Sequence, residues 1–329
     1  QGMDYWQILV LAAVRLGCNL DYDKLQDLAE QHRALRHIMG IGDWEEDACF
    51  DWRRIQDNVT KIRPKTIERI NHPIVAEGHR LVPEAAETVR ADSFVAETNI
   101  HYPTESTLIR DGLRKLLALG DDLATQIGAG GWRQHKHLYR KAKRVARQID
   151  RIAARKGSRY QERLKAPYRE LLVLADTIVT RAENLQKRLR RRRSADAEVL
   201  ALDAQLQVFL ERTRHVCGTA HRRVLEGEQV PNQDKLFSIF ESHTQLYKRG
   251  KAATPVQFGR QVLVYEDGAG FVSHAYLLPR DKDDRDVVVE QTRSLQRRLK
   301  GRIRRASFDR GFHSPENQRQ LAKIVAHPC

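Results

Sequence analysis

Hydrophobic residues recur every three or four positions along most of the chain, a spacing typical of helices with one buried face. In residues 1–82 this pattern predicts several short helices. Asp21 or Asp23 caps the second, the third runs from about Trp44 to Val59, and a fourth begins near Pro64, because proline is tolerated in a first turn. We expect three isoleucines of the fourth helix to face the core: Ile67, Ile70 and Ile74.

The pattern changes to strict alternation in residues 83–103. Val89 and Ala91 alternate with Arg90 and Asp92, which predicts a strand with a carboxylate at its exposed end. A carboxylate in that position either caps the following turn or takes part in chemistry. The alternation alone leaves both interpretations open.

Residues 104–230 return to helical spacing. Thr104 or Ser106 can cap the first helix, and three later segments carry hydrophobic residues in steps of four and three. We expect breaks near Gly157, Pro167 and Ser194, which would make this region an antiparallel bundle or coiled-coil arm. The three hydrophobic seams run from Leu138 to Ile152, from Leu171 to Leu189 and from Val199 to Val216.

The basic charge is concentrated in this helical region. The chain has a formal net charge of +15, and the stretch from Arg133 to Arg193 holds 21 lysine and arginine residues against 5 aspartate and glutamate residues. A globular protein this basic usually meets a polyanion. One run of four arginines could either contact phosphates or form a solubilising turn, and we favour contact with nucleic acid. The run is Arg190, Arg191, Arg192 and Arg193. The lysine and arginine residues of residues 1–82 could either contact DNA or form a solvated face, and the sequence does not decide between the two.

Residues 231–329 mix strands and helices. Two alternating segments flank an Asp-Gly turn, a signature of a hairpin. An amphipathic helix and another strand follow. The expected elements are the hairpin strands Gln257–Glu266 and Gly270–Leu278, the helix Asp284–Lys300, the strand Arg302–Phe308 that ends on Asp309, and a helix from Pro315 to about Ile324 with Ser314 as its cap.

Asp92 and Asp309 therefore both belong to predicted strands. If these strands share one sheet, the crossover helix makes the last strand parallel to a neighbour and places Asp309 at the edge where ligands usually bind. Two carboxylates that lie close together repel each other unless a cation sits between them. Hard oxygen ligands favour Mg²⁺ or Mn²⁺, ions that serve phosphoryl transfer.

Three stretches carry a resemblance to a known family. VRADSFVAETNIHYPTES, KLFSIFESHTQLYKRGKAATPVQFG and ASFDRGFHSPENQRQL resemble, in this order, the catalytic core of bacterial insertion-sequence DDE transposases of the ISNCY-type group. The resemblance covers nearly the whole chain. It implies a mostly helical α+β protein with an incomplete ribonuclease-H-like mixed sheet, an N-terminal helical domain and a large inserted helical coiled-coil bundle. Carried over residue by residue, Asp92 matches the first catalytic acid and Asp309 the second.

The resemblance also implies an activity. Such enzymes bind Mg²⁺ or Mn²⁺, cut double-stranded DNA at transposon ends and join it to a target, and they act as dimers or larger assemblies. Lys248 and Lys251 match a stretch beside the active site and would contact phosphates. A third acid, usually Glu, lies on a helix after one more strand, so we expect it beyond Cys329 and expect the chain to be truncated at its C-terminus and also at its N-terminus. Glu316 is the nearest substitute, but a glutamate that opens a helix has an ordinary structural role.

Two other interpretations remain. The chain could be a non-catalytic, basic, helical DNA-binding remnant with half a metal site, or, less in keeping with the charge, a coiled-coil scaffold without nucleic acid. No run approaches the roughly 20 apolar residues of a membrane span, so we expect a cytoplasmic protein, associated with the nucleoid when bound to DNA. Its four cysteines lack the paired spacing of a zinc site or a disulfide framework.

Overall fold

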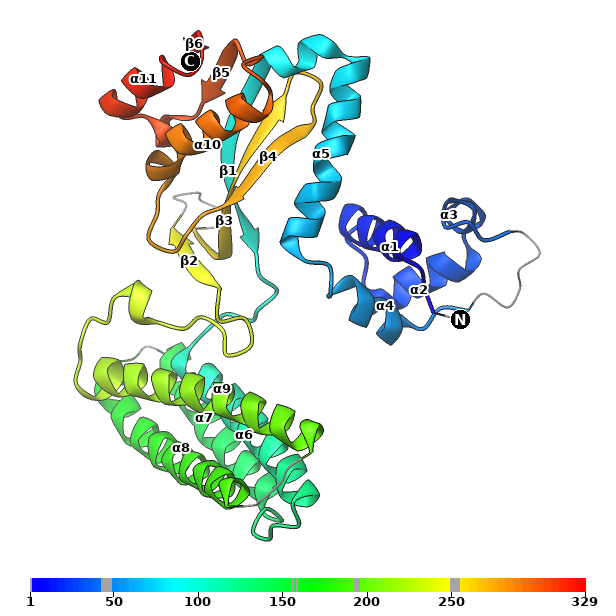
Figure 1. Ribbon diagram of the computed structural model, residues 1–329. Coiled ribbons are helices and arrows are strands. Elements are labelled where there is room, and N and C mark those ends of the chain that lie inside the picture. Colours follow the sequence, from blue (N-terminus) through cyan, green and yellow to red (C-terminus); the bar gives the residue numbers. More distant parts are fainter. Residues whose placement is uncertain (1, 43–48, 156, 158, 192–195, 249–254) are drawn as a thin grey trace. The chain divides into compact units, whose positions relative to one another are not determined.

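The computed structural model describes residues 2–42, 49–155, 157, 159–191, 196–248 and 255–329. The chain is a mostly helical α+β protein, as predicted, with helices before and between the strands of a mixed sheet (Figure 1). Its contacts divide it into two compact units. The first contains Gln1–Val89, Glu266–Ser273 and Gly301–Arg305, and the second contains Arg90–Tyr265, His274–Lys300 and Ala306–Cys329.

Short helices at the N-terminus share a small core. Of the third predicted helix the structure describes the part from Trp52, where the Asp51 side chain caps it by accepting from the N–H groups of Arg53 and Arg54 at 3.0 Å each. Its expected start at Trp44 is not among the described residues. Residues 43–48 lie outside the described part. The helices are α1 (Tyr5–Gly17), α2 (Tyr22–Gln31), capped by Asp21 as expected, α3 (Arg33–Ile38), which the pattern did not predict, and α4 (Trp52–Val59). Their core is built from Val10, Leu11, Leu25, Ala29, Leu35, Met39, Ile41, Phe50 and Ile55.

Helix α5 (Pro64–Leu81) buries a different face from the predicted one. Ile67 and Ile74 are 52% and 55% exposed, so the prediction that they face the core is wrong. The buried face carries Gly78 and His79, and a Cβ atom on Gly78 would lie 2.6 Å from the Phe271 ring. Glycine at this position therefore lets the helix backbone approach the 266–273 segment of the same unit, and η1 (Pro83–Glu87) leads from α5 into the sheet.

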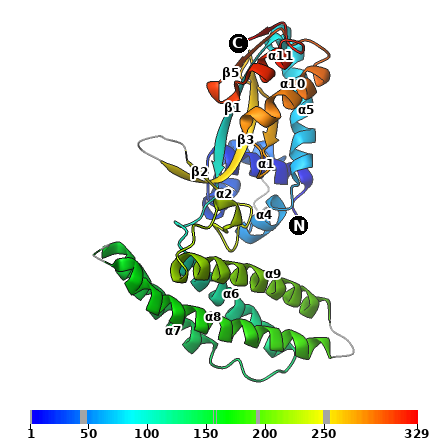
Figure 2. The same cartoon turned by 90° about the vertical axis from the view of Figure 1, so that its left-hand side faces the viewer.

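The inserted helices pack side by side in both views of the ribbon (Figures 1 and 2). Hydrophobic residues from all three predicted seams are buried in their common core. Pro167 does not break a helix as predicted but lies within α8, where Tyr168 and Leu171 beside it are buried. Ser194 lies outside the described residues. The helices are α6 (Glu105–Gln126), α7 (His135–Arg155), α8 (Tyr160–Arg190) and α9 (Ala197–Ala220), followed by a π-helical turn, η2 (His221–Leu225).

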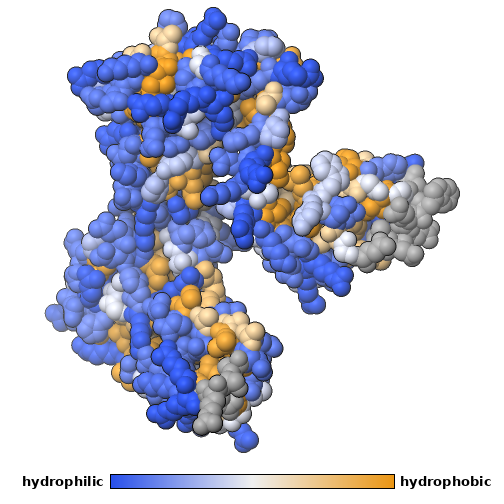
Figure 3. Space-filling view, viewed as in Figure 1, coloured by the Kyte–Doolittle hydropathy of each residue, from blue (hydrophilic) through white to orange (hydrophobic). Residues whose placement is uncertain are grey.

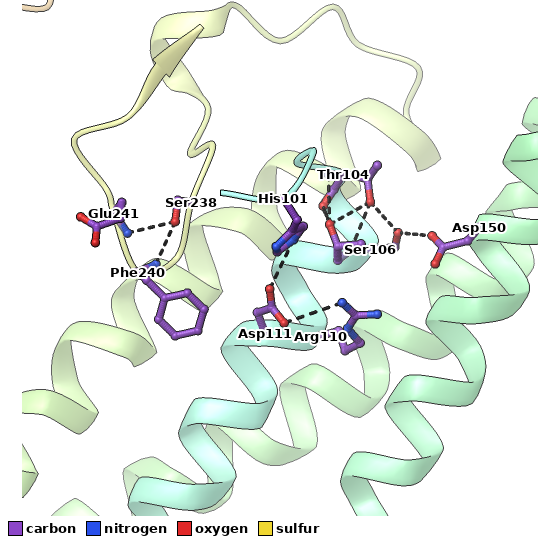
Figure 4. A network of polar contacts seen from close by, with 10 residues as sticks. His101, Thr104, Ser106, Arg110, Asp111, Asp150, Ser238, Phe240 and Glu241 are labelled. Carbon is purple, nitrogen blue, oxygen red and sulfur yellow. Dashed lines mark hydrogen bonds and ion pairs between the residues drawn. The ribbon is translucent and has the colours of Figure 1, made fainter. Parts of the chain in front are cut away.

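Local hydrogen bonds fix the start of this helical bundle (Figure 4). Thr104 caps α6, as predicted, and forms a capping box with Thr107. Ser106 donates to Asp150 of α7 at 3.0 Å, and His101 lies 3.4 Å from Asp111. The chain that leaves the sheet is thus tied to two of the bundle helices within a few residues.

The described residues form a six-stranded sheet in the order β2-β3-β1-β5-β6, with β4 also paired to β3. Strand β3 runs antiparallel to β2, and bonds from Thr98 to Phe258 and from Gly268 to Ala85 show that it is also antiparallel to β1. Bonds from Cys329 to Ala306 and from Phe308 to Cys329 show that β6 continues the sheet in parallel with β5. The strands are β1 (Thr88–Glu97), β2 (Gln245–Lys248), β3 (Val256–Asp267), β4 (Val272–Leu277), β5 (Arg305–Phe308) and β6 (His327–Pro328).

Helix α10 (Asp284–Arg298) connects β4 to β5 as the predicted crossover. It buries Val288 and Leu295, and the Tyr265 hydroxyl of β3 contacts the Thr292 hydroxyl at 2.8 Å. The remaining short helices are η3 (Asn232–Asp234), η4 (Arg310–Phe312) and α11 (Pro315–Leu321), which Ser314 caps as predicted. Among the described residues, no helix is long and apolar enough to cross a membrane.

Candidate metal and nucleic-acid site

Asp92 and Asp309 lie on neighbouring strands of the sheet. The Arg304 N–H donates to the Glu87 carbonyl at 2.8 Å, just where β5 and β1 begin. Because both strands start from this bond, they run in the same direction. Asp92 is five residues past Glu87 and Asp309 five residues past Arg304, and neighbouring strands are about 4.8 Å apart. The fold thus brings the two acids to within about one residue of the same level, with Asp92 opposite Phe308 and Asp309 just past the end of β5.

The two acids differ in their local settings. Asp92 is in the middle of β1 and not at its end, so the predicted position at a strand end is wrong, although its side chain is exposed as predicted. The strand extends further because Val95 is buried and β1 stays paired with β3 as far as Thr98. Asp309 follows β5 directly and caps η4, where its carboxylate accepts the Arg310 N–H at 2.6 Å.

Within the described residues, neither acid has a cationic partner. The chain has 58 lysine and arginine residues, yet within the described part of it Asp92 and Asp309 form no ion pair. The Asp92 carboxylate accepts the N–H of Ser93 at 2.7 Å through Oδ1, which leaves Oδ2 available. Carboxylates without a counter-ion are oxygen donors of the kind that a hard cation prefers. Among the described residues, no group of three or more His, Cys, Asp or Glu side chains is arranged to hold a metal ion.

A cavity of about 450 Å³ lies beside Asp309. Phe312 and Leu321 form part of an apolar wall, and Asp309 and Arg310 supply charge. The cavity lies at the carboxyl end of the Asp309 strand, where the sequence predicts a ligand site, and binding of a ligand there stays a prediction.

Sequence reasoning missed a polar cluster next to Asp92. The Asp284 carboxylate, at the start of α10, accepts the Ser93 hydroxyl at 2.7 Å and the Gln261 amide at 2.9 Å. The Gln261 amide also reaches the Ser93 hydroxyl at 3.1 Å. A Cβ atom on Gly311 would lie 3.9 Å from Asp284 Oδ2, so the helix start also lies near the turn that follows Asp309. Asp284 therefore links β1, β3 and α10 on the face of β1 that carries Ser93, near the turn that follows Asp309.

The sequence offered little sign of this role. Asp283 and Asp286 form the capping box of α10, and an acidic residue in a first turn is common for reasons of the helix dipole. Asp284 could be separated from these capping residues only once β1, β3 and α10 were known to meet.

Replacing Asp284 with alanine should destabilise the second unit. The change leaves the Ser93 hydroxyl without its acceptor and the Gln261 amide with Ser93 alone, at a cost of about 1–3 kcal/mol in the free energy of unfolding. Urea unfolding followed by circular dichroism would measure it. The matched control is Asp281→Ala, three residues earlier and exposed, which should stay within about 0.5 kcal/mol of the parent chain. Equal stability of both variants would show that the Asp284 cluster has no positioning role.

The other predicted site residues are spread over the fold. Lys248 is exposed at the end of β2, separated from β1 by β3. Arg190 and Arg191 are exposed at the end of α8. Lys251, Arg192 and Arg193 lie outside the described residues.

Glu316 has the ordinary helical role that its position suggested. Its carboxylate accepts from the Gln320 amide at 2.8 Å and pairs with Arg319 at 2.7 Å within α11. The hydrogen bond from Gln320 and the charge of Arg319 lower the pKa of this carboxyl. Both partners lie on the same helix, so the contacts support α11 itself.

No protein-family model matches the chain, and no curated protein or solved structure does either. A function is therefore inferred from the strand order, from the two acids that lack an ion-pair partner among the described residues, and from the distribution of charge.

Proposed function

We propose that the chain carries the catalytic core of a DNA transposase of the DDE class, resembling the ISNCY-type group, with Asp92 and Asp309 as two of its catalytic acids. The observation that carries this proposal is their position. Asp92 lies on β1 and Asp309 directly follows the neighbouring parallel strand β5, each five residues beyond the Glu87–Arg304 hydrogen bond, and each lacks a cationic partner among the described residues. A positively charged chain whose described residues leave two carboxylates of neighbouring strands without a counter-ion is suited to an external cation.

The arrangement of the sheet supports a ribonuclease-H-like core. Strands β3 and β4 form an antiparallel hairpin on one side of β1, and β5 and β6 continue the sheet in parallel on the other. The two acids lie on β1 and directly after β5, the first pair of parallel strands in the sheet order. A helical bundle inserted after the first acid, as the resemblance implies, accounts for the long stretch of sequence between them.

The residues have distinct roles in this proposal. Asp92 and Asp309 would hold Mg²⁺ or Mn²⁺, their carboxylate oxygens being the hard ligands that such ions prefer. When bound, the metal supplies activation of the attacking oxygen and stabilisation of the leaving one. Asp284 positions the β1 backbone beside Asp92 through Ser93, and Lys248 binds DNA phosphate as an exposed cation.

A second candidate function is DNA binding without catalysis. It is favoured by one observation: within the described residues, no third His, Cys, Asp or Glu joins the two acids in a metal-ligating group. The basic bundle would then be the functional part, and the two acids would have no shared ion.

An affinity-cleavage experiment separates the two candidates. Fe²⁺ can take the place of Mg²⁺ at oxygen ligands, and with ascorbate and peroxide it cuts the peptide backbone next to where it is bound. We expect cuts near residues 92 and 309 of the full chain, suppressed by excess Mg²⁺ and lost in both Asp92→Asn and Asp309→Asn. The matched control is Glu316→Gln, an exposed acid close to Asp309 in sequence, which should keep both cuts. Cuts that persist in both Asn variants, or that map elsewhere, would overturn the metal site.

A further inference from the structure

Helix α7 differs in charge from the other bundle helices. It contains eight lysine and arginine residues and one aspartate, a net charge of +7. Helices α6 and α9 each carry a net charge of −1, and α8, which is ten residues longer than α7, carries +3. The basic excess of the inserted bundle is therefore concentrated on one helix, and hydrophilic residues cover most of the bundle surface that Figure 3 shows.

The cations of α7 form an ordered row. Ala142, Val145 and Ile149 are buried in the bundle core, so the opposite side of the helix faces solvent. That side carries a row in steps of four, three and four, which covers about 16 Å at 1.5 Å per residue. We call it the α7 stripe, and its members are Arg140, Arg144, Arg147 and Arg151, all exposed. They line one shallow depression, together with Lys143 and Asp150.

The part of the chain that the structure describes does not neutralise the stripe. Among the described residues, the arginines of the stripe form no ion pair, and Asp150 accepts a hydrogen bond from Ser106. Other cations of the bundle region are paired: Lys165 of α8 lies 2.8 Å from Glu162, and Arg223 pairs with Glu105. Like charges one turn apart destabilise a helix by about 0.2–0.5 kcal/mol per pair. A mixed-charge face would keep the bundle in solution without this cost, so an unpaired row indicates a polyanionic partner.

The surroundings of the stripe favour a nucleic acid duplex over other polyanions. A helix that binds a membrane surface needs an exposed apolar face, but the apolar face of α7 is buried in the bundle. Single-stranded nucleic acid is usually held by exposed aromatic residues on which bases stack, and Tyr139, the aromatic residue of α7, packs against the core. Arginines in a straight row without aromatic neighbours match the regular phosphates of a double helix.

We propose that the α7 stripe binds the phosphate backbone of double-stranded DNA without reading its sequence. The choice of DNA over double-stranded RNA rests on the proposed transposase function, while the duplex phosphates follow from the stripe itself. Because α7 lies in the insertion and Asp92 in the sheet, the stripe is a contact separate from the metal site.

The test compares two variants with equal loss of charge. In the first, Arg140, Arg144, Arg147 and Arg151 are all replaced by glutamine. In the second, the matched control, Arg163, Arg169, Arg181 and Lys187 of α8 are replaced by glutamine. Binding of the full chain to a 30-base-pair DNA duplex of arbitrary sequence is measured by fluorescence anisotropy between about 50 and 200 mM salt. Circular dichroism at each salt concentration confirms that both variants keep their helices.

We expect the stripe variant to lose at least tenfold in affinity at the lowest salt. The slope of log K against log salt should become less steep by about 3 to 4, since each lost phosphate contact removes about 0.9. In the control variant the slope should change by less than half as much. Equal slopes in the two variants, or a stripe variant that loses binding to anionic vesicles but not to the duplex, would overturn the proposal. Binding needs neither Asp92 nor Asp309, so this test and the Fe²⁺ cleavage test can fail independently.

Discussion

Replacing Gly259 with alanine should lower the free energy of unfolding by about 3 kcal/mol or more. A Cβ atom at this position would overlap the Ala96 carbonyl oxygen and lie 2.8 Å from its carbon and 2.9 Å from the Glu97 Cα. These are backbone atoms of β1, so no side-chain rotation can relieve the overlap. The two strands would have to separate, with loss of bonds such as the one from the Thr98 N–H to the Phe258 carbonyl.

The matched control for this change is Gly218→Ala. Gly218 lies within α9, and a Cβ atom there would meet no atom within 4 Å. Alanine should therefore stabilise the chain slightly, by about 0.5–1 kcal/mol, because glycine loses more backbone freedom than alanine in a helix. Urea unfolding measured by tryptophan fluorescence and circular dichroism gives both values. If the free energy of unfolding of Gly259→Ala lay within 0.5 kcal/mol of the parent value, the close pairing of β3 with β1, the strand that carries Asp92, would be wrong.

Replacing Asp267 with alanine should destabilise the first unit by about 3–5 kcal/mol. Its side chain is fully buried, and Oδ2 accepts from His79 Nε2 at 2.6 Å and from the Ser273 hydroxyl at 2.8 Å. Its other oxygen accepts the N–H groups of Ala269 and Phe271, both at 3.0 Å. Alanine would leave all of these donors buried without an acceptor. Thermal unfolding would show the loss, while Glu77→Ala, which breaks an exposed pair on the same α5, should leave the midpoint nearly unchanged.

The same carboxylate makes stability depend on pH. Burial alone would raise the pKa of Asp267, but the hydrogen bonds from His79, Ser273 and the two backbone N–H groups outweigh it and lower the pKa. A lowered pKa in the folded state means that the contribution is complete above the usual aspartate value of about 3.9 and is lost as pH falls through the folded-state value. The parent should therefore lose more stability than Asp267→Ala between pH 5 and pH 3. Parallel pH profiles of the two chains would contradict this.

The sequence predicted most elements because their signals are local. The heptad seams of α7, α8 and α9, the turn after Asp267 and the cap at Ser314 depend on neighbouring residues, and each was found where expected. The exceptions depend on contacts between distant segments. Pro167 remains inside α8 because the bundle core holds the residues after it, which outweighs the local cost of proline.

The candidate site shows the same division. Asp92 and Asp309 were recognised as strand acids because alternation and the DRGF motif are local. Their nearness along neighbouring strands and the contacts of Asp284 depend on the pairing of β1 with β5 and on the docking of α10, which no local pattern contains. The buried face of α5 was misjudged for the same reason, since Gly78 and His79 are buried by a segment nearly 190 residues later.

The discontinuous first unit has a consequence during synthesis. His79 and its partner Asp267 are 188 residues apart, and a ribosome adds about 5–20 residues per second. Helix α5 therefore leaves the ribosome roughly 10–40 s before the turn that buries its inner face. During that interval the face of α5 that carries Val75, Gly78 and His79 remains uncovered. The small core of α1 to α4 and the inserted bundle can already be complete by then. The nascent chain should thus be most open to chaperones and proteases along α5.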